Sequence, residues 1–214
     1  PPSGGPGVPR VLNFVEYLPE VGWKPILLTV KDADFPARDE SLLKEVPADI
    51  DVHRTEIFEP YDLYRKLTGK SKSTAVDVNN IDGGSKTRFS DKIAEFIRAT
   101  FFIPDARIGW KKHAVKEGKK IIDSERPDII FSSSPPYTCA LIAMELKKYA
   151  EKKYGTPIPW VSDFRDAWTD YLTTPNRWFL PKKIDRKYER TTPDKADTMT
   201  IVASGMKDDF ERKF

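Results

Sequence analysis

The chain has 214 residues, of which 39% are hydrophobic and 32% are charged. This balance is typical of a globular protein with a buried core and excludes an intrinsically disordered chain. Lys and Arg total 36 and Asp and Glu total 33, so the formal net charge is only +3, which does not indicate a nucleic-acid-binding protein.

The opening of the chain is a loop rich in proline and glycine. PPSGGPGVPR contains four prolines and three glycines, which is typical of a connection between two elements. We therefore expect the chain to belong to a longer protein, with a strand before Pro1. The final stretch, SGMKDDFERKF, has the pattern of a helix that continues past Phe214, so both ends are expected to be truncated.

Helix and strand patterns alternate after this loop. Apolar residues recur at helical spacing over residues 8–18. ILLTV then predicts a buried strand and IDVHRTEI a second one, which is the order of an α/β unit. Residues 69–87 are polar, contain two adjacent glycines and lack periodicity, so they predict a mobile surface loop.

The second half of the chain has a more regular pattern. An amphipathic, aromatic-rich stretch precedes a lysine-covered helix that is expected to begin near Ile108. Three further strands are predicted at Asp128–Phe131, Pro159–Phe164 and MTIVAS. Because strands alternate with helices, we expect an α/β fold in which all five strands form one doubly wound, Rossmann-like parallel sheet.

Three glycines, Gly4, Gly5 and Gly7, stand directly before the first predicted helix. Glycines let backbone N–H groups approach a ligand, and a helix N-terminus attracts anions. The loop does not match a dinucleotide fingerprint, because Arg10 stands where the third glycine belongs, and it lacks the Lys-Ser/Thr pair of a P-loop. The sequence predicts a generic phosphate or sugar loop that includes Arg10, with a simple tight turn as the alternative.

Polar residues also follow two neighbouring predicted strands. The first group is Ser133, Ser134 and Pro135, and the second is Asp163, Arg165 and Asp166. Ser134 is expected to cap a helix that begins with Pro135 and Pro136. Open α/β sheets bind ligands at the carboxyl ends of their strands, so these groups form a candidate site. The alternative for the three charged residues is a structural cluster of ion pairs.

The remaining residues give little indication of other chemistry. The single cysteine, Cys139, excludes a disulfide framework and a cysteine-rich zinc site, and we expect it to be a packed thiol. His53 and His113 lie far apart in the sequence, so no metal site is expected. The sequence has no apolar run that could span a bilayer and no signal peptide, which predicts a cytoplasmic protein.

Four stretches resemble the N-terminal domain of bacterial family 4-like glycosyltransferases, which have the GT-B fold. In the order of the family, they are SGGPGVPRVLNFVEYLPEVGWKPILLTV, PDARIGWKKHAVKEGKKI, RPDIIFSSSPPYTCALIA and PWVSDFRDAWTDY. The resemblance covers nearly the whole chain except residues 69–87. It implies that residues 1–214 form one acceptor-side domain, the N-terminal half of a GT-B two-domain architecture, without the C-terminal donor-binding domain.

The resemblance also implies an activity. A sugar would pass from a nucleotide-sugar donor to a saccharide or lipid-linked acceptor in cell-envelope or exopolysaccharide assembly, with retention, no bound metal and no further cofactor. The glycine-rich loop would approach the donor diphosphate or the acceptor. Asp163, Arg165 and Asp166 would hold acceptor or sugar hydroxyls. Many relatives have a histidine where this chain has Arg165, so a histidine-based role does not transfer.

Other functions and a membrane contact stay open. A GT-B sugar-nucleotide epimerase and a non-catalytic Rossmann-like binding module are the alternatives, and no nucleic-acid partner is expected. Relatives often use lipid-linked acceptors at the inner face of the plasma membrane. Phe96, Phe101 and Phe102 near Arg98, followed by a lysine-rich helix, suit an anionic membrane interface. The alternative is a helix packed on its own domain.

Overall fold

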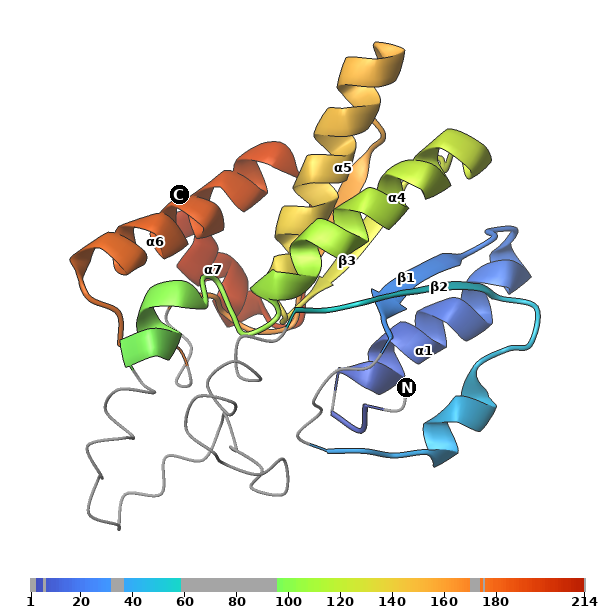
Figure 1. The fold of residues 1–214 in the computed structure, drawn as a ribbon, viewed down its shortest axis with the longest axis horizontal. Helices are drawn as coiled ribbons and strands as arrows, with labels where there is room; N and C mark the ends of the chain where they lie inside the picture. The colour runs from blue at the N-terminus through green and yellow to red at the C-terminus, as the bar shows by residue number, and fades with distance from the viewer. Residues whose placement is uncertain are drawn as a thin grey trace. The chain divides into compact units, whose positions relative to one another are not determined.

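The computed structural model describes residues 3–5, 7–31, 37–58, 96–169, 174 and 176–213. The chain divides into two compact units, Pro1–Asn80 and Ile81–Phe214, and each contains a parallel sheet with its own helices (Figure 1). The predicted mobile loop at 69–87 lies outside the described residues.

The first unit is built from one helix and two parallel strands. Its elements are α1 (Val8–Tyr17), η1 (Leu18–Val21), β1 (Ile26–Val30), η2 (Ser41–Glu45) and β2 (Asp51–Thr55). Leu12 and Val15 are buried one helical turn apart on α1, and proline occupies its first turn as predicted. Gly22 ends η1 with a φ of 86°, a conformation that glycine adopts without steric strain. Ile26 pairs with Asp51 at the start of the parallel ladder.

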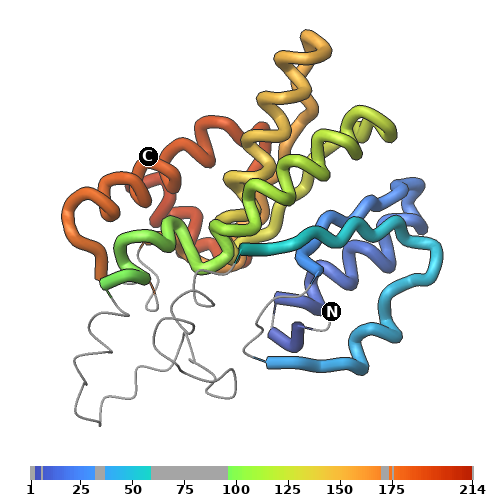
Figure 2. The backbone as a smooth tube through the Cα atoms, in the orientation of Figure 1, coloured from blue at the N-terminus to red at the C-terminus, as the bar shows by residue number. Residues whose placement is uncertain are grey.

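The second unit alternates helices and strands. After a helical segment at 96–101 come η3 (Ile108–Trp110), α4 (Lys111–Glu125), β3 (Ile130–Ser134), α5 (Thr138–Tyr154), β4 (Trp160–Phe164), α6 (Phe179–Lys195), β5 (Thr198–Ile201) and α7 (Ser204–Lys213). The strands form a parallel sheet in the order β3-β4-β5. The backbone path in Figure 2 follows this alternation from green to red.

The prediction of parallel strands in an α/β fold is confirmed, because β1 and β2 pair in parallel, as do β3, β4 and β5. The prediction of one five-stranded sheet differs from the structure, in which the described strands form one sheet of two strands and one of three. The two sheets belong to different units, and the ladders of the described strands stay within each unit. Sequence patterns identify strands, but they do not show which edges become paired.

The core of the second unit lies on one face of the three-stranded sheet. Successive side chains of a strand point to opposite faces, so Trp160, Ser162 and Phe164 share the face that α5 covers. The buried cluster consists of Tyr137, Ala140, Leu141, Ala143, Trp160, Phe164 and Trp168. Small alanines on α5 leave room for the two large aromatic side chains of β4, and this packing anchors the carboxyl end of the sheet.

Asp123 joins the carboxyl-terminal parts of α4 and α5. Its carboxylate accepts hydrogen bonds from the hydroxyls of Tyr149, at 2.9 Å, and Tyr154. Lys153 Nζ lies 2.7 Å from Asp123 Oδ2. Hydrogen bonds from Lys153 and then Tyr154 are the main causes that lower the pKa of Asp123 to about 2.

We expect Asp123→Asn to destabilise the chain near neutral pH but to have little effect near the acid end. Because the folded-state pKa of about 2 lies below the ordinary value of 3.8, the stabilisation is present above that ordinary value and is lost as the pH falls toward about 2. Thermal unfolding of parent and variant across this range measures the effect. Glu125→Gln, at an exposed position nearby, is the control. A Tm difference that does not change with pH would contradict the prediction.

Candidate functional site

The carboxyl ends of β3 and β4 bring two of the predicted segments together. Parallel pairing places Ser133 opposite Asp163, and Ser133 Oγ donates a hydrogen bond to Asp163 Oδ2 at 2.7 Å. The backbone N–H of Arg165 donates to the carbonyl of Ser134 at 2.9 Å. The Arg165 guanidinium donates to the carbonyl of Pro135. These residues therefore form one cluster at the edge of the sheet where parallel strands bind ligands.

Asp163 lies at the centre of this cluster and is fully buried. Its Oδ2 accepts from Ser133 on β3, and its Oδ1 accepts from Thr200 Oγ1 on β5 at 2.6 Å. The three residues are aligned across the sheet, so one carboxylate connects all three strands at the same level. Because both oxygens accept hydrogen bonds from the protein, the geometry favours a positioning role for Asp163 over direct contact with a substrate.

Two buried polar atoms of the cluster are without a hydrogen-bond partner within the described part of the chain. They are Ser134 Oγ and Arg165 Nε. Buried donors in proteins are almost always satisfied by protein, water or ligand. Ser134 is fully buried, whereas Arg165 is half-buried, so Arg165 Nε is the candidate contact for a ligand oxygen. Asp166 follows directly and is also half-buried. Arg165 and Asp166 are therefore the predicted site residues whose polar groups are best placed to meet a ligand.

The helix after this cluster begins later than predicted. α5 starts at Thr138, and Ser134 does not cap it, because Ser134 is the last residue of β3 and is held in the strand ladder opposite Phe164. Asp105 takes the capping role: its carboxylate accepts from the N–H of Thr138 at 2.9 Å and from its Oγ1 at 2.8 Å. Burial is the main cause that raises the pKa of Asp105. A carboxylate here is favoured by both the free N–H groups and the helix dipole.

Two buried aromatic side chains hold the loop that follows β4 in place. Tyr137 and Trp168 stack with their ring centroids 4.5 Å apart, and both are buried. The hydroxyl of Tyr137 donates to the carbonyl of Ala167 at 2.5 Å. These contacts fix the backbone on the carboxyl side of Arg165 and Asp166.

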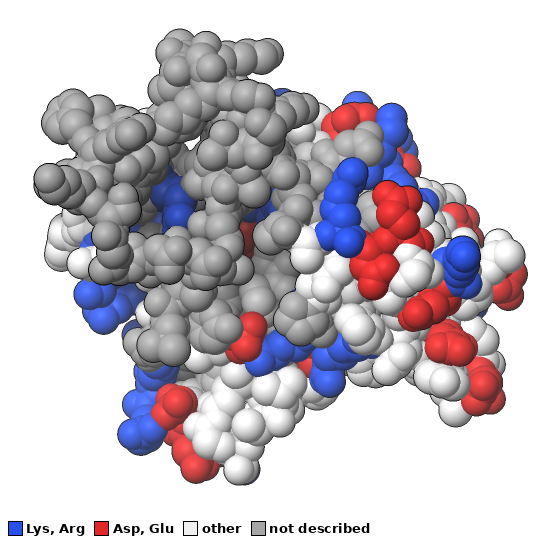
Figure 3. All heavy atoms as spheres, turned by 90° about the horizontal axis from the view of Figure 1, so that it is seen from below, with Lys and Arg blue, Asp and Glu red and all other residues white. Residues whose placement is uncertain are grey.

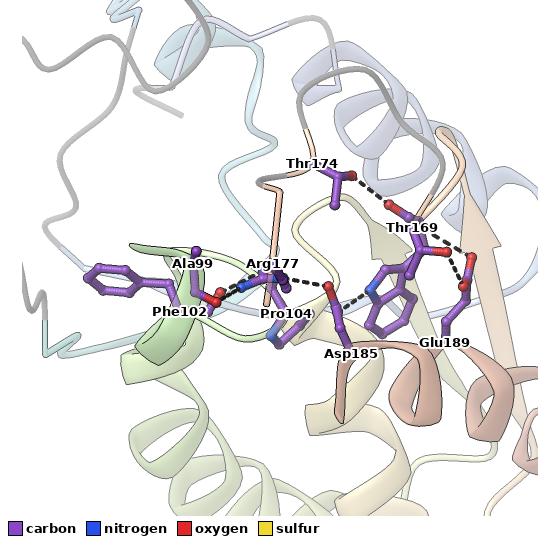
Figure 4. A network of polar contacts seen from close by, with 9 residues as sticks. Ala99, Phe102, Pro104, Thr169, Thr174, Arg177, Asp185 and Glu189 are labelled. Carbon is purple, nitrogen blue, oxygen red and sulfur yellow. Dashed lines mark hydrogen bonds and ion pairs between the residues drawn. The ribbon is translucent and has the colours of Figure 1, made fainter. Parts of the chain in front are cut away.

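A buried polar network extends from this loop to α6 (Figure 4). Trp168 Nε1 donates to Asp185 Oδ1 at 2.8 Å, and Arg177 Nε donates to Asp185 Oδ2 at 2.8 Å. The side chains of Arg177 and Asp185 are each 2% exposed. Burial is the main cause that raises the pKa of Asp185, and the charge of Arg177 opposes it. The other guanidinium nitrogens of Arg177 donate to the carbonyls of Ala99, Phe102 and Pro104.

Glu189 completes the network one turn further along α6. It accepts hydrogen bonds from the N–H of Thr169 at 3.2 Å and from its hydroxyl at 2.6 Å. Sequence reasoning missed this network. The available indication was that Asp185 and Glu189 lie four residues apart, and hence on one face, in a helix that is otherwise largely basic.

The glycine-rich loop belongs to the first unit. The N–H of Gly4 donates to the carbonyl of Ala37 at 3.0 Å, and a Cβ on Gly4 would lie 3.2 Å from Cβ of Asp39. A side chain on Gly4 would therefore require Asp39 to move by a few tenths of an ångström, and the N–H of Gly4 is used within the protein. Among the described residues, a Cβ on Gly5 would meet only Ser3 Oγ, at 4.0 Å. Substitution of Gly5 is therefore sterically tolerated.

The other two residues predicted for this loop lie on or next to α1. Gly7 is the N-cap residue of the helix. Arg10 is half-buried, and its guanidinium lies 5.5 Å from the ring centroid of Phe14. This contact directs the Arg10 side chain along its own helix.

Several features bear on the other predicted properties. In the described part of the chain, no group of three or more His, Cys, Asp or Glu could hold a metal ion, and no helix is long and apolar enough to cross a membrane. Burial, and then the charge of Asp105, raise the pKa of Cys139 to about 12, so the thiol is protonated at neutral pH. On the face shown in Figure 3, basic and acidic side chains are interspersed.

Comparisons with protein-family models, curated proteins and solved structures find no match to this chain.

Proposed function

We propose that the chain is the acceptor-side domain of a GT-B-type glycosyltransferase similar to the bacterial family 4-like enzymes. The observation that carries the proposal is the contact between the FSSSPP and DFRDAW motifs at the carboxyl ends of β3 and β4. An α/β fold alone hosts many functions. Two motifs of the resembled family, joined by side-chain hydrogen bonds at the ligand-binding edge of a sheet, are more specific than the fold.

The geometry supports a division of roles within the cluster. Within the described residues Arg165 Nε has no hydrogen-bond partner, and it can donate to an acceptor hydroxyl or phosphate oxygen. The half-buried carboxylate of Asp166 can accept from sugar hydroxyls. Asp163 has a positioning role, because its carboxylate connects Ser133 on β3 with Thr200 on β5.

In the proposed reaction, the acceptor hydroxyl oxygen bonds to the anomeric carbon of the donor sugar. The bond from that carbon to the nucleoside diphosphate breaks, and the hydroxyl proton leaves with the diphosphate. By resemblance, the configuration at the anomeric carbon is retained and a second domain holds the nucleotide sugar. The loop of Gly4, Gly5 and Gly7, with Arg10, would face the donor diphosphate, where helix N-termini and basic side chains stabilise the departing charge.

The proposal predicts that Arg165→Ala and Asp166→Ala each reduce kcat of the full-length enzyme about 10- to 100-fold, because each removes a charge-assisted hydrogen bond to the substrate. Tm should change little, because both side chains are only partly buried. Donor hydrolysis and transfer are measured with UDP-, GDP- and dTDP-sugars. Asp128→Ala, an exposed change at the opposite end of the same sheet, is the matched control and should leave kcat unchanged.

The same assay distinguishes the other functions. An epimerase would isomerise a nucleotide sugar without an acceptor, and a binding module would bind one without turnover. A purely structural ion-pair cluster would give the reverse of the expected pattern, in which Arg165→Ala and Asp166→Ala lower Tm while the folded variants keep the specific activity of the parent. Each of these three results would overturn the proposed roles.

A further inference from the structure

Five of the large apolar side chains that the second unit exposes come from two segments. Phe96 and Phe101 lie on the helical segment 96–101 and are 57% and 68% exposed. Trp178, Phe179 and Leu180 lie at the start of α6 and are 45%, 78% and 49% exposed. We call these five residues the aromatic patch. Single exposed apolar residues are common on proteins, whereas a group of them marks an interaction surface.

Hydrogen bonds hold the two segments of the aromatic patch together. Trp178 Nε1 donates to Thr100 Oγ1 at 2.9 Å. Arg177, the residue before Trp178, donates to the carbonyls of Ala99 and Phe102, both at 2.9 Å (Figure 4). Residues on either side of Phe101 are thus bonded to the residues directly before Phe179. The exposed aromatic side chains form part of one ordered surface.

The charge next to the aromatic patch has one sign. Within residues 179–190, all of which are described, every exposed charged side chain is basic, and the two acids, Asp185 and Glu189, are buried in the network. The exposed bases are Lys182, Lys183, Arg186, Lys187 and Arg190. At about 100° per residue, they lie on the same side of α6 as Phe179. The helix therefore presents an aromatic end followed by a basic stripe.

Phe102 does not belong to the aromatic patch. The sequence left open whether Phe96, Phe101 and Phe102 contact a membrane or pack on their own domain, and Phe102 is 3% exposed and packs inside the unit. Trp178 and Phe179 lie more than seventy residues later in the sequence, and the Arg177 contacts and the bond from Trp178 to Thr100 connect them to the helical segment 96–101.

We propose that the aromatic patch and the basic stripe of α6 dock the chain on an anionic phospholipid bilayer. Tryptophan and phenylalanine favour the headgroup region, where their rings leave water while the polar atoms stay hydrated. The stripe is complementary to lipid phosphates, and its charge is not offset by exposed acids within the same stretch. A protein partner would need to match both features, whereas an anionic bilayer offers both by its nature. The docking does not depend on the proposed activity.

The test measures the fraction of the full chain that sediments together with phospholipid vesicles. One set contains phosphatidylcholine alone, and the other also contains about 30% phosphatidylglycerol. The parent should bind the anionic vesicles and not the neutral ones. Phe101→Ser with Phe179→Ser should weaken binding about tenfold or more, and because both side chains are largely exposed, Tm should stay close to that of the parent.

A charge pair of variants separates docking from general attraction. Lys183→Glu with Arg186→Glu should abolish binding to the anionic vesicles. Lys112→Glu with Lys116→Glu, which makes the same change of charge at exposed positions of α4, should leave most of it. An equal loss of vesicle binding in the two charge-reversal variants would overturn the proposed surface. Unchanged binding of the variant Phe101→Ser with Phe179→Ser would overturn it as well. The proposal would also be overturned if the parent formed dimers through the aromatic patch and did not bind vesicles. The patch would then bind a second copy of the chain.

Discussion

Replacing Arg177 with methionine is expected to lower the free energy of unfolding by about 3–5 kcal/mol. The change leaves the carboxylate of Asp185 buried without its cation, at a position where the side chain is 2% exposed. It also removes the donors to the carbonyls of Ala99, Phe102 and Pro104. A buried charge and buried carbonyls without partners are among the costliest single changes in a protein. Urea unfolding followed by circular dichroism measures the loss.

The neighbouring residue of Asp185 supplies the control. Arg186→Met removes the same charge from an exposed position on α6 and should change stability by less than about 0.5 kcal/mol. Arg177→Lys should fall between the two, because an ammonium keeps the charge but cannot reach all the acceptors that the guanidinium fork reaches. Loss in Arg177→Met no larger than that in Arg186→Met would contradict the central role of the network.

The Arg177 change also has a local consequence. Because the helical segment 96–101 is bonded to the α6 start through this side chain, the backbone amides of that segment should exchange faster in Arg177→Met than in Arg186→Met. Vesicle binding by Arg177→Met should also be weaker than that of the parent, because the two segments of the aromatic patch keep, among the hydrogen bonds of the described residues, only the bond from Trp178 to Thr100. The parent is the reference for this measurement, since Arg186 belongs to the basic stripe.

The sequence patterns identify the described strands because strands of this kind carry local information, although the strand predicted at Asp128–Phe131 is observed at Ile130–Ser134. The stretch Pro159–Phe164 begins with a proline, contains three large apolar residues and ends before Arg165, and the observed strand, Trp160–Phe164, differs from it by one residue. Parallel pairing follows from the alternation of such runs with helices. Both inferences need only neighbouring residues, and both hold in the structure.

Contacts between distant residues leave no such pattern, and these are what sequence reasoning missed. Asp105 caps a helix that begins at Thr138, 33 residues later. Arg177 binds a carbonyl 78 residues earlier. The division of the strands into two sheets likewise depends on which edges pair, and the apolar character of a strand does not determine this.

The candidate site shows what the sequence predicts and what it does not predict. The position of Asp163 at a strand end was predicted, but its role depends on the residues beside it in neighbouring strands. Ser133 and Thr200 occupy the same level of the sheet and bind its two oxygens. Three polar residues in register on three buried strands cannot be recognised until the pairing is known. Arg165 is bonded to the carbonyls of Ser134 and Pro135, and Arg165 and Asp166 are both half-buried, so their predicted role stays a prediction.

Replacing Trp168 with alanine is expected to cost about 3–5 kcal/mol of stability. The side chain is 1% exposed and stacks on Tyr137, so its removal leaves a cavity beneath the loop. Trp168→Phe should cost about 1–2 kcal/mol, because a phenyl ring keeps much of the stacking but cannot donate to Asp185. The difference between the two variants separates the packing of the ring from the hydrogen bond of the indole. Urea unfolding of both measures it.

The effect of Trp168→Phe on activity then tests how the loop contributes to the proposed function. Trp168 is buried and so contacts no substrate, but it fixes the backbone that presents Arg165 and Asp166. We therefore expect Trp168→Phe to lower Tm more than Arg165→Ala does, and to lower kcat of the full-length enzyme less. A residue that binds the substrate shows the opposite ordering, because its interaction is made mainly in the complex. If Trp168→Phe instead lowered kcat more than Arg165→Ala does and lowered Tm less, the loop would have to move so that the indole reaches the substrate. The buried stack with Tyr137 would then not describe the active state.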